Sequence, residues 1–435
     1  MILALSLLAL AVAPAERAAA QSPVATTATA ERQAPSVAAA AAPAGDHLTI
    51  YLMTMGIGAA VWERFGHNAI WVHDDSAGTD LVYNYGTFSF RQDNFILRFI
   101  QGRMMYWLGV TDLASTMEVY RYFRRSVTVQ ELDLTPAQEA ALRDFLAWNA
   151  QEENRFYRYD YYRDNCSTRV RDALDRVLGG ALRAVSEPAS HGETYRFHTR
   201  RSTTNDPLLY TGLELALGPA ADRPINGWEE MFLPAKVAYY VAQVRVPGPD
   251  GTPVPLVKSE RVLYASDAFS VRDAPPDWVT GYFTIGTLLG LGMAWLGFRA
   301  GERRAARFGF VALAGLWCLA AGAAGLVLVF LWAFTDHAAA YANTNLLQTS
   351  PLAFLLLFLL TPLALGNPRV ARPATRLALA MVILSAVGLG LAALALQDNR
   401  EIIALTLPAN VGLLLGVRSV CSSVARASGA DRPTA

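Results

Sequence analysis

The sequence is poor in cysteine and in charge, and it has no excess of either sign. Only 3 of its 435 residues are cysteine, which excludes a scaffold held together by several disulfides. Charged residues make up 17%, against about 25% in typical proteins, and 37 basic residues balance 37 acidic ones. Without a basic excess the chain is not expected to bind nucleic acid, and its 53% hydrophobic content excludes a disordered chain.

The first 46 residues have the composition of a targeting segment. An apolar run over residues 2–13, followed by small residues before Gln21, is typical of a secretory signal peptide, which we assign to residues 1–20. An uncleaved membrane anchor is the alternative, because the positively charged start of a signal peptide is missing. Residues 21–46 are rich in Ala, Thr, Pro and Ser without periodicity, which predicts a flexible tether.

Residues 47–275 have the composition of a soluble domain in which strands and helices alternate irregularly. This irregularity favours an α+β fold over a doubly wound parallel sheet. Segments rich in β-branched and aromatic residues predict strands, and helical spacing or N-cap signals predict helices. The predicted strands are 47–54, 67–73, 80–88, 126–134 and a hairpin of 236–246 with 253–264. The predicted helices are 93–101, 135–149 with a capping box at Thr135, and one that Asn165 caps.

Residues 276–435 form a second domain that is rich in long apolar stretches. Crossing the hydrocarbon core of a bilayer takes about 20 helical residues. Three stretches are long enough outright, and the third and fifth need flanking residues to span. The predicted transmembrane helices lie near 279–298, 308–334, 351–366, 377–396 and 402–417.

The charges of the connecting loops fix the predicted orientation of these five helices. Four arginines lie between 299 and 307 and three between 369 and 376, whereas residues 335–350 contain neither Lys nor Arg. The fourth connection has only Arg400. Basic loops stay on the cytoplasmic side, so the C-terminus is predicted to be cytoplasmic. Residues 47–275 then lie outside, in agreement with the signal peptide.

The position of each cysteine makes Cys166 a candidate nucleophile. Cys318 lies in the second predicted span and Cys421 follows the last, so Cys166 is the only thiol of the external domain. It follows the predicted N-cap Asn165, where unpaired backbone N–H groups and the helix dipole favour a thiolate. A buried structural cysteine is the alternative interpretation.

A cysteine nucleophile needs a base, and His67 is the best-placed candidate. It begins a predicted strand, which would hold the imidazole rigidly. A structural histidine bonded to a loop is the alternative. His73 ends the same strand and is predicted to lie in a turn. The external domain also contains His47, His191 and His198.

The segment FGHNAIWV at residues 65–72, followed by YYRDNCSTR at 161–169, resembles the circularly permuted branch of the NlpC/P60 papain-like superfamily. More specifically, residues 49–265 are similar to the external domain of the DUF4105 family, which includes the Lnb-type lipoprotein N-acyltransferases of bacteria. The membrane part is similar to the Lnb type as well. The motifs behind this similarity are WERFGHNAIWV, YNYGTFSF, NRFYRYDYYRDNCSTRVRD, ETYRFHTR and WEEMFLP.

This resemblance implies a fold and a location. The fold is an α+β permuted papain-like (NlpC/P60-type) external domain followed by a five-helix transmembrane domain. The chain is then a multi-pass protein of the bacterial inner membrane, and its catalytic domain lies in the periplasm.

The resemblance also implies site residues. It makes Cys166 the nucleophile and His67 the general base, and it places a third, orienting residue near Asn84. Ordinary hydrogen bonding of a strand asparagine is the alternative for Asn84. The candidate substrate-binding residues are Arg163, Asp164, Arg169 and Arg200, together with His337, Asn343 and Asn345 of the loop between the second and third spans. Solvated surface charge and a plain interhelical loop are the alternatives for these residues.

The implied reaction is ping-pong acyl transfer. An acyl chain of a phospholipid moves to a thioester on Cys166 and then to the N-terminal amine of a diacylated lipoprotein, at the surface of the lipid bilayer. Backbone N–H groups at the start of the 166–178 helix are expected to hold the oxyanion. We expect no cofactor and no metal, because neither an HExxH nor a CxxC motif is present.

Two other classes of function stay open at this point. One is a cell-wall amidase or peptidase of the NlpC/P60 type, which predicts a polar groove and activity without the membrane part. The other is a non-enzymatic membrane scaffold or sensor, which requires Cys166 to lie away from His67. The position of the sulfur relative to the imidazole therefore discriminates between an enzyme and a scaffold.

Overall fold

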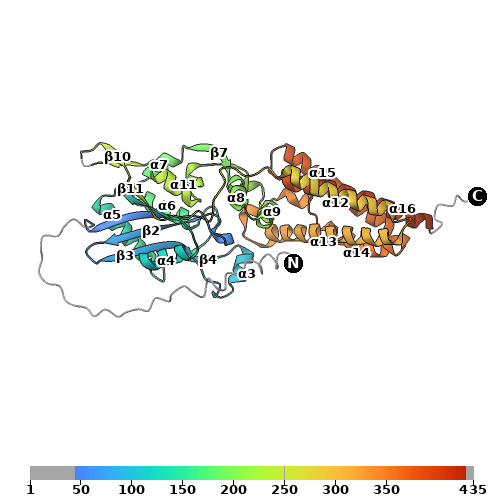
Figure 1. Cartoon of the computed structure of the whole chain (residues 1–435), viewed down its shortest axis with the longest axis horizontal. Coiled ribbons are helices and arrows are strands. Elements are labelled where there is room, and N and C mark those ends of the chain that lie inside the picture. The colour runs from blue at the N-terminus through green and yellow to red at the C-terminus, as the bar shows by residue number, and fades with distance from the viewer. Residues whose placement is uncertain (1–44, 249, 428–435) are drawn as a thin grey trace, which may run out of the picture. The chain divides into compact units, whose positions relative to one another are not determined.

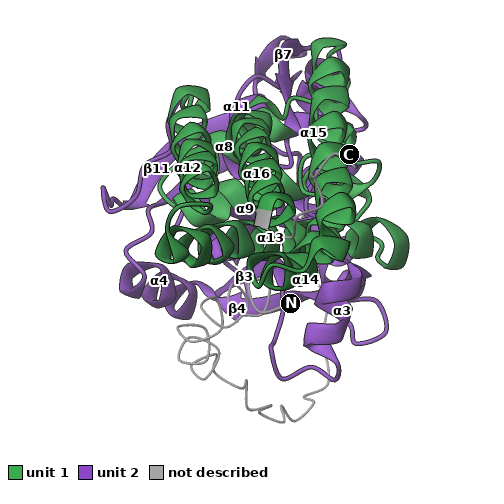
Figure 2. Ribbon diagram, turned by 90° about the vertical axis from the view of Figure 1, so that its right-hand side faces the viewer, with its two compact units in different colours: residues 1–7, 196–223, 274–435 green, residues 8–195, 224–273 purple. Residues whose placement is uncertain are grey.

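The structure is a computed structural model that describes residues 45–248 and 250–427 (Figure 1). The predicted signal peptide and all but the end of the predicted tether lie outside the described residues. The described chain divides into two compact units, which Figure 2 shows in different colours. Unit 1 contains Arg196–Arg223 and the chain from Ala274 onward, and unit 2 contains the chain up to Tyr195 together with Pro224–Asp273.

One part of the predicted external domain packs with the apolar helices. Residues 196–223, predicted within the external domain 47–275, fall in the same compact unit as those helices, and the predicted domain boundaries themselves stay a prediction. Hydrogen bonds explain this packing, because the side chains of Asn343 and Asn345 donate to backbone carbonyls of residues 214–216. No periodicity in the sequence marks such a contact.

Unit 2 is built on a seven-stranded antiparallel sheet in the order β11-β5-β1-β2-β3-β4-β6. Four of its strands coincide with predicted ones, β11 lies within the predicted strand over residues 253–264, and β4 and β6 were not predicted. The strands are β1 (Leu48–Met55), β2 (His67–Asp74), β3 (Thr79–Thr87), β4 (Met105–Asp112), β5 (Val127–Leu132), β6 (Phe156–Arg158) and β11 (Val257–Tyr264).

Helices and two small sheets complete unit 2. The helices are η1 (Val61–Glu63), α3 (Phe95–Gln101), α4 (Leu113–Tyr122), α5 (Pro136–Asn149), α6 (Cys166–Val177), α7 (Ala181–Ser186), α10 (Gly227–Glu230) and α11 (Pro234–Val241). The small sheets pair β7 (Ser190–Thr194) with β8 (Pro224–Asn226), and β9 (Arg245–Pro247) with β10 (Pro253–Pro255).

The predicted strand over residues 236–246 is wrong. Its first part is the helix α11, and only β9 and β10 form the expected hairpin. Pro234 occupies the first turn of α11, where its fixed φ suits a helix. Val237, Tyr240 and Val241 are buried at helical spacing, so tertiary packing overrides their preference for strands.

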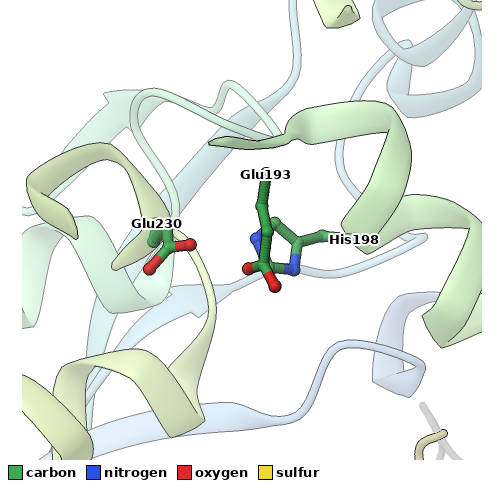
Figure 3. A group of neighbouring side chains, drawn as sticks. All are labelled: Glu193, His198 and Glu230. Carbon is green, nitrogen blue, oxygen red and sulfur yellow. The ribbon is translucent and has the colours of Figure 1, made fainter. Parts of the chain in front are cut away.

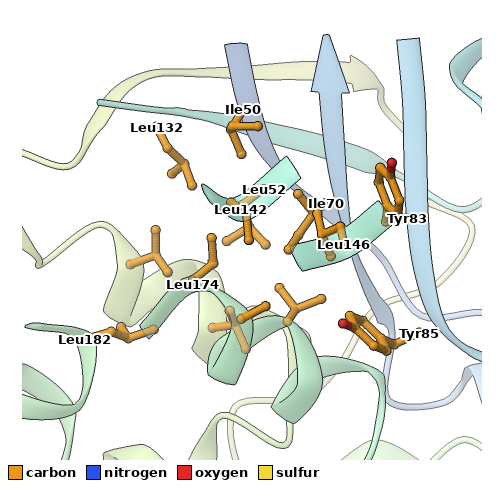
Figure 4. Packing of buried hydrophobic residues seen from close by; sticks show 14 of the residues in the cluster. Ile50, Leu52, Ile70, Tyr83, Tyr85, Leu132, Leu142, Leu146, Leu174 and Leu182 are labelled. Carbon is orange, nitrogen blue, oxygen red and sulfur yellow. The ribbon is translucent and has the colours of Figure 1, made fainter. Parts of the chain in front are cut away.

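The core of unit 2 lies between the sheet and the helices α5 and α6 (Figure 4). Ile50, Leu52 and Ile70 of the sheet belong to one buried cluster with Leu142 of α5 and Leu174 of α6. Full burial of one such side chain stabilises the fold by about 1.5–3 kcal/mol. Because α6 packs directly against β2 and β3, this core fixes where the first residue of α6, Cys166, lies.

Unit 1 contains five helical segments that are long and apolar enough to span a membrane, counted over the described residues. They are Val279–Arg299, Arg304–Phe334, Thr344–Ala364, Pro368–Ala393 and Arg400–Arg426. The helices of this unit are α8 (Tyr195–Thr203, whose first residue belongs to unit 2), α9 (Pro207–Ala216), η2 (Pro219–Ala221), α12 (Val279–Arg299), α13 (Arg304–Phe334), η3 (Ala338–Ala340), η4 (Thr344–Leu347), α14 (Leu352–Ala364), η5 (Pro368–Val370), α15 (Ala371–Ala393) and α16 (Arg400–Ala427).

The helices α12 and α16 approach each other through glycines. A Cβ added at Gly290 would lie 2.4 Å from the carbonyl oxygen of Pro408, and one at Gly412 would lie 2.1 Å from that of Gly290. Small residues four apart, such as Gly412 and Gly416, are a common means of close helix packing in membranes. A larger side chain at either contact would push these two helices apart.

Candidate active site

The three predicted catalytic residues come together in unit 2. His67 begins β2, Asn84 lies in β3 and Cys166 begins α6. The register pairs Ile70 of β2 with Tyr83 of β3, which brings the start of β2 near the end of β3. A Cβ at Gly86, whose φ is +82°, would lie 3.2 Å from the Cβ of Cys166, so the first turn of α6 rests on this glycine.

Cys166 is a half-buried residue, and its thiol is electrostatically activated. Burial by itself raises the pKa of the thiol, because it disfavours the charged form. The charge of His67 and a hydrogen bond from its ring act in the opposite direction, as do the backbone N–H of Asn68 and the hydroxyl of Ser167. These contacts prevail and lower the pKa of Cys166 to about 7, so a large share of the thiol is thiolate at neutral pH.

Asn84 contacts His67 with its side-chain oxygen. The Nε2 atom of His67 lies 3.4 Å from Oδ1 of Asn84. The amide nitrogen of Asn84 donates to the carbonyl of Val82 and to the hydroxyl of Thr111, each at 3.2 Å, which fixes the orientation of the amide. An amide oxygen only accepts hydrogen bonds, so Nε2 of a neutral His67 carries the proton and Nδ1 keeps the lone pair.

The N-cap of α6 corrects the expectation that several helix N–H groups hold the oxyanion. The side-chain oxygen of Asn165 accepts hydrogen bonds from the backbone N–H groups of Ser167, at 2.9 Å, and Thr168, at 3.0 Å. The amide nitrogen of Asn165 donates to the carbonyls of Tyr161 and Phe232. The cap is therefore held from both sides, and two N–H groups of the first turn are already occupied.

A wall of three tyrosines next to Cys166 was not predicted from the sequence. The rings of Tyr106 and Tyr159 pack in a tilted arrangement with centroids 4.3 Å apart, and the ring of Tyr157 lies 6.4 Å from that of Tyr159. Burial raises the pKa of all three hydroxyls, and the nearby Cys166 raises it further. The wall is therefore an uncharged, poorly hydrated surface beside the sulfur. Its only sequence signal is the run of aromatic residues that ends shortly before Cys166.

Three of the predicted substrate-binding residues line one cleft in unit 2. The cleft has a volume of about 410 Å³, and Arg163, Asp164 and Arg169 lie in its wall with Asp172 and Arg176. Asp164 and Arg169 form a two-pronged ion pair with N–O distances of 2.5 and 2.6 Å. Arg163 is exposed. The cleft thus presents both signs of charge, and part of the charge of Arg169 is already balanced.

The other predicted substrate-binding residues lie in unit 1. Arg200 is buried and forms ion pairs with Glu214, at 2.5 Å, and Asp398, at 2.6 Å. Asn343 donates to the carbonyl of Leu215 at 2.8 Å, and Asn345 donates to that of Glu214 at 3.1 Å. Through these contacts Arg200 and both asparagines have a structural role, because they hold the C-terminal end of α9. His337 immediately precedes η3 of the same loop. A role of these four residues in substrate binding stays a prediction.

His73, Glu193 and Glu230 of unit 2 have other partners. His73 lies within β2 rather than in the predicted turn, and its ring contacts Asp80 at 2.8 Å and Asp75 at 3.0 Å. The carboxylates of Glu193 and Glu230, drawn in Figure 3 with His198 of unit 1, lie 3.5 and 3.0 Å from the ammonium group of Lys236. Lys236 therefore balances part of their negative charge. The expected absence of a metal cofactor stays a prediction.

Two family models match this chain. The model described as the Lnb N-terminal periplasmic domain matches residues 38–202, and the model described as the Lnb transmembrane domain matches residues 277–421. No curated protein and no solved structure matches it. Cys166, His67 and Asn84 all lie in the first matched range, and the second range covers the candidate spans of unit 1 almost completely.

Proposed function

Because the chain belongs to the Lnb family, with a periplasmic domain followed by five membrane helices, we propose that it is a lipoprotein N-acyltransferase. It moves an acyl chain from a phospholipid, through a thioester on Cys166, to the N-terminal amine of a diacylated lipoprotein. The observation that carries this proposal is the position of Cys166 near His67, beside Asn84 and Gly86 of one strand, where the charge of His67 lowers the pKa of the thiol to about 7. The arginines of the first and third interhelical loops favour a cytoplasmic C-terminus.

The first half-reaction forms the acyl-enzyme. His67 accepts the proton of the Cys166 thiol, and the sulfur attacks the carbonyl carbon of a phospholipid ester. When the tetrahedral intermediate collapses, the ester C–O bond breaks and the leaving oxygen takes the proton from His67. The products are a lysophospholipid and a thioester on Cys166.

The second half-reaction transfers the acyl chain to nitrogen. The free amine of the lipoprotein attacks the thioester carbonyl, and the C–S bond breaks as the amide forms. His67 accepts the proton of the amine and returns it to the sulfur of Cys166. Because Ser167 and Thr168 donate to Asn165, we assign the oxyanion contact within the first turn to the N–H of Cys166 itself.

We propose that Asn84 is the orienting third residue. An amide can hold the ring of His67 and its tautomer, but it carries no charge that would stabilise the imidazolium. The cysteine–histidine–asparagine combination is an established variant of the catalytic triad. Asn84 therefore positions the base without competing for the proton.

We propose the charged cleft of unit 2 as the place where the donor head group binds. Phospholipid head groups carry a phosphate and, in many cases, an ammonium group, and the cleft offers arginines and carboxylates. Arg163 supplies an exposed positive charge, and the Asp164–Arg169 pair can open toward a phosphate and an amine.

Three observations favour acyl transfer over the alternatives. The tyrosine wall is poorly hydrated, which suits an acyl chain better than the polar peptide of a cell-wall amidase. The five membrane helices keep the site close to two lipid substrates, which raises their effective concentration. A non-enzymatic scaffold requires Cys166 to lie away from His67, whereas the two side chains lie close enough for His67 to lower the pKa of the thiol.

Complementation tests the proposal. A strain that lacks its own N-acyltransferase is supplied with this chain, and the N-terminus of a lipoprotein is analysed by mass spectrometry. We expect an added acyl chain with the unchanged protein and with Cys421→Ala, and none with Cys166→Ala. The acyl-enzyme should appear as a hydroxylamine-labile adduct on the peptide that contains Cys166.

Two outcomes would contradict the assignment. A Cys166→Ala variant that folds and retains most of its turnover would remove the nucleophile. Release of a peptidoglycan fragment without any change to lipoproteins would favour the cell-wall amidase instead.

A further inference from the structure

Unit 2 exposes a group of large apolar side chains that no part of the proposed reaction uses. We call it the α3 patch and define it as Val61, Trp62, Ile96, Leu97 and Ile100. Their exposed fractions are 40%, 40%, 52%, 53% and 36%. A cluster of exposed apolar side chains of this kind marks a site of interaction with a protein or a membrane.

The α3 patch is one continuous surface because its two segments pack on the same group of aromatic rings. Trp62 of η1 lies 5.8 Å from the rings of both Phe88 and Phe90. Phe90 in turn lies 5.0 Å from Phe95, the buried first residue of α3. Ile96, Leu97 and Ile100 follow on the exposed side of the same short helix.

The charges around the α3 patch fit a phospholipid surface. Residues 91–103 contain Arg91, Arg98 and Arg103 but only one acidic residue, Asp93. Arg91 and Arg103 are exposed. Exposed apolar side chains with arginines at their margin are typical of segments that lie in the head-group region of a bilayer.

The α3 patch is also connected to the active site by stacked rings. Phe88 stacks on Tyr106 at 4.9 Å, and Tyr106 packs on Tyr159 at 4.3 Å. Both tyrosines lie close enough to Cys166 for the thiolate to raise their pKa. A continuous series of packed aromatic rings therefore connects α3 with the surroundings of the sulfur.

We propose that the α3 patch is a membrane-contact surface, which enters the head-group region of the bilayer and guides one acyl chain of the donor phospholipid along the rings of Phe88, Tyr106 and Tyr159 to Cys166. The contact with the membrane stands on these observations alone, and the guiding of the donor rests on the proposed function.

Photocrosslinking tests the contact. The photoreactive residue p-benzoylphenylalanine replaces Leu97 in the full chain, in vesicles of phosphatidylethanolamine and phosphatidylglycerol. As a matched control it replaces Val262, which is 62% exposed in β11, at the opposite edge of the sheet from β4 and β6. We expect phospholipid adducts at position 97 and at least about tenfold fewer at position 262. Adducts to protein at position 97, whether to residues 1–44 or to a second copy, or equal lipid adducts at both positions, would overturn the proposal.

A kinetic arm tests the guiding of the donor. The double variant Ile96→Asp with Leu97→Asp should form the acyl-enzyme from vesicle phospholipid at least about tenfold more slowly. Alkylation of Cys166 by water-soluble iodoacetamide, and acylation by a short-chain soluble ester, should keep their rates. Unchanged acylation from vesicles refutes the guiding role. If no variant forms a thioester but position 97 still crosslinks to lipid, the proposed function fails and the membrane contact stands.

Discussion

Removing the imidazole of His67 should change how the reactivity of Cys166 depends on pH. The charge of His67 is the largest influence that lowers the pKa of the thiol to about 7, against an ordinary value near 9. In His67→Ala the pKa should rise to about 9 or above, because burial then acts with less opposition. A rise of two pKa units corresponds to about 2.7 kcal/mol of lost thiolate stabilisation.

The expected rates follow from two opposing effects. At pH 7 the thiolate fraction falls from about one half to about one hundredth, which is a loss of about 50-fold. A thiolate of higher pKa is the better nucleophile, and a Brønsted coefficient of about 0.4–0.5 returns roughly 6–10-fold. His67→Ala should therefore react about 5–8-fold more slowly at pH 7 and faster than the unchanged protein well above pH 8.

The measurement is the rate of alkylation by iodoacetamide between pH 5 and 10, followed on the Cys166 peptide by mass spectrometry. Peptide analysis separates Cys166 from Cys318 and Cys421. His73→Ala is the matched control, because His73 lies on the same strand but contacts Asp75 and Asp80. If His67→Ala keeps a midpoint near 7 and is slower by a constant factor at every pH, the electrostatic explanation is wrong.

Three further variants test other contacts of unit 2. Asn84→Ala should lower turnover by about 10–100-fold, because Asn84 orients His67. The pH midpoint of Cys166 alkylation should change little, because Asn84 carries no charge. An unaltered turnover would refute the orienting role. Gly86→Ala should cost more free energy of activation for acylation than free energy of unfolding, because a Cβ at this position meets Cys166 and φ is +82°. A variant that acylates at the normal rate would contradict the contact. Burial raises the pKa of Glu139 to about 7, so the contribution of this carboxyl to stability is full below pH 4.5 and falls as the pH rises through 7. Glu139→Gln should remove this loss of stability, which is on the order of 1–3 kcal/mol. Tm measured at pH 5 and at pH 8, in both the variant and the unchanged protein, checks this expectation.

The parts of the fold that the sequence could predict are those with local signals. The capping box at Thr135 and the N-cap at Asn165 mark the starts of α5 and α6 to the residue, because capping is a contact between near neighbours. The strands β1, β2 and β3 follow from their composition. The helix α11 was mistaken for a strand, since its valines and tyrosines favour strands and only packing makes them helical.

Prediction of the candidate site was limited because contacts between residues far apart in the sequence leave no local signal. Cys166 and His67 could be chosen because few residues in the external domain can serve as nucleophile and base. The ion pair of Arg200 with Asp398 joins residues 198 positions apart, and no local sequence pattern indicates it. The tyrosine wall likewise depends on β4 and β6, the two strands that were not predicted.

The surroundings of Cys166 must also decide what happens to the thioester, because water and the amine compete for it. The rings of Tyr106, Tyr157 and Tyr159 keep this side of the sulfur poorly hydrated, so His67 has little water to activate. Tyr159→Ser should therefore raise the ratio of free fatty acid to N-acylated lipoprotein several-fold, while the alkylation midpoint of Cys166 stays near 7. Mass spectrometry of both products gives this ratio, and Tyr162→Ser, whose ring packs on Tyr195 and Phe232 instead, is the matched control. An equal ratio in both variants would mean that exclusion of water by the tyrosine wall does not decide between transfer and hydrolysis.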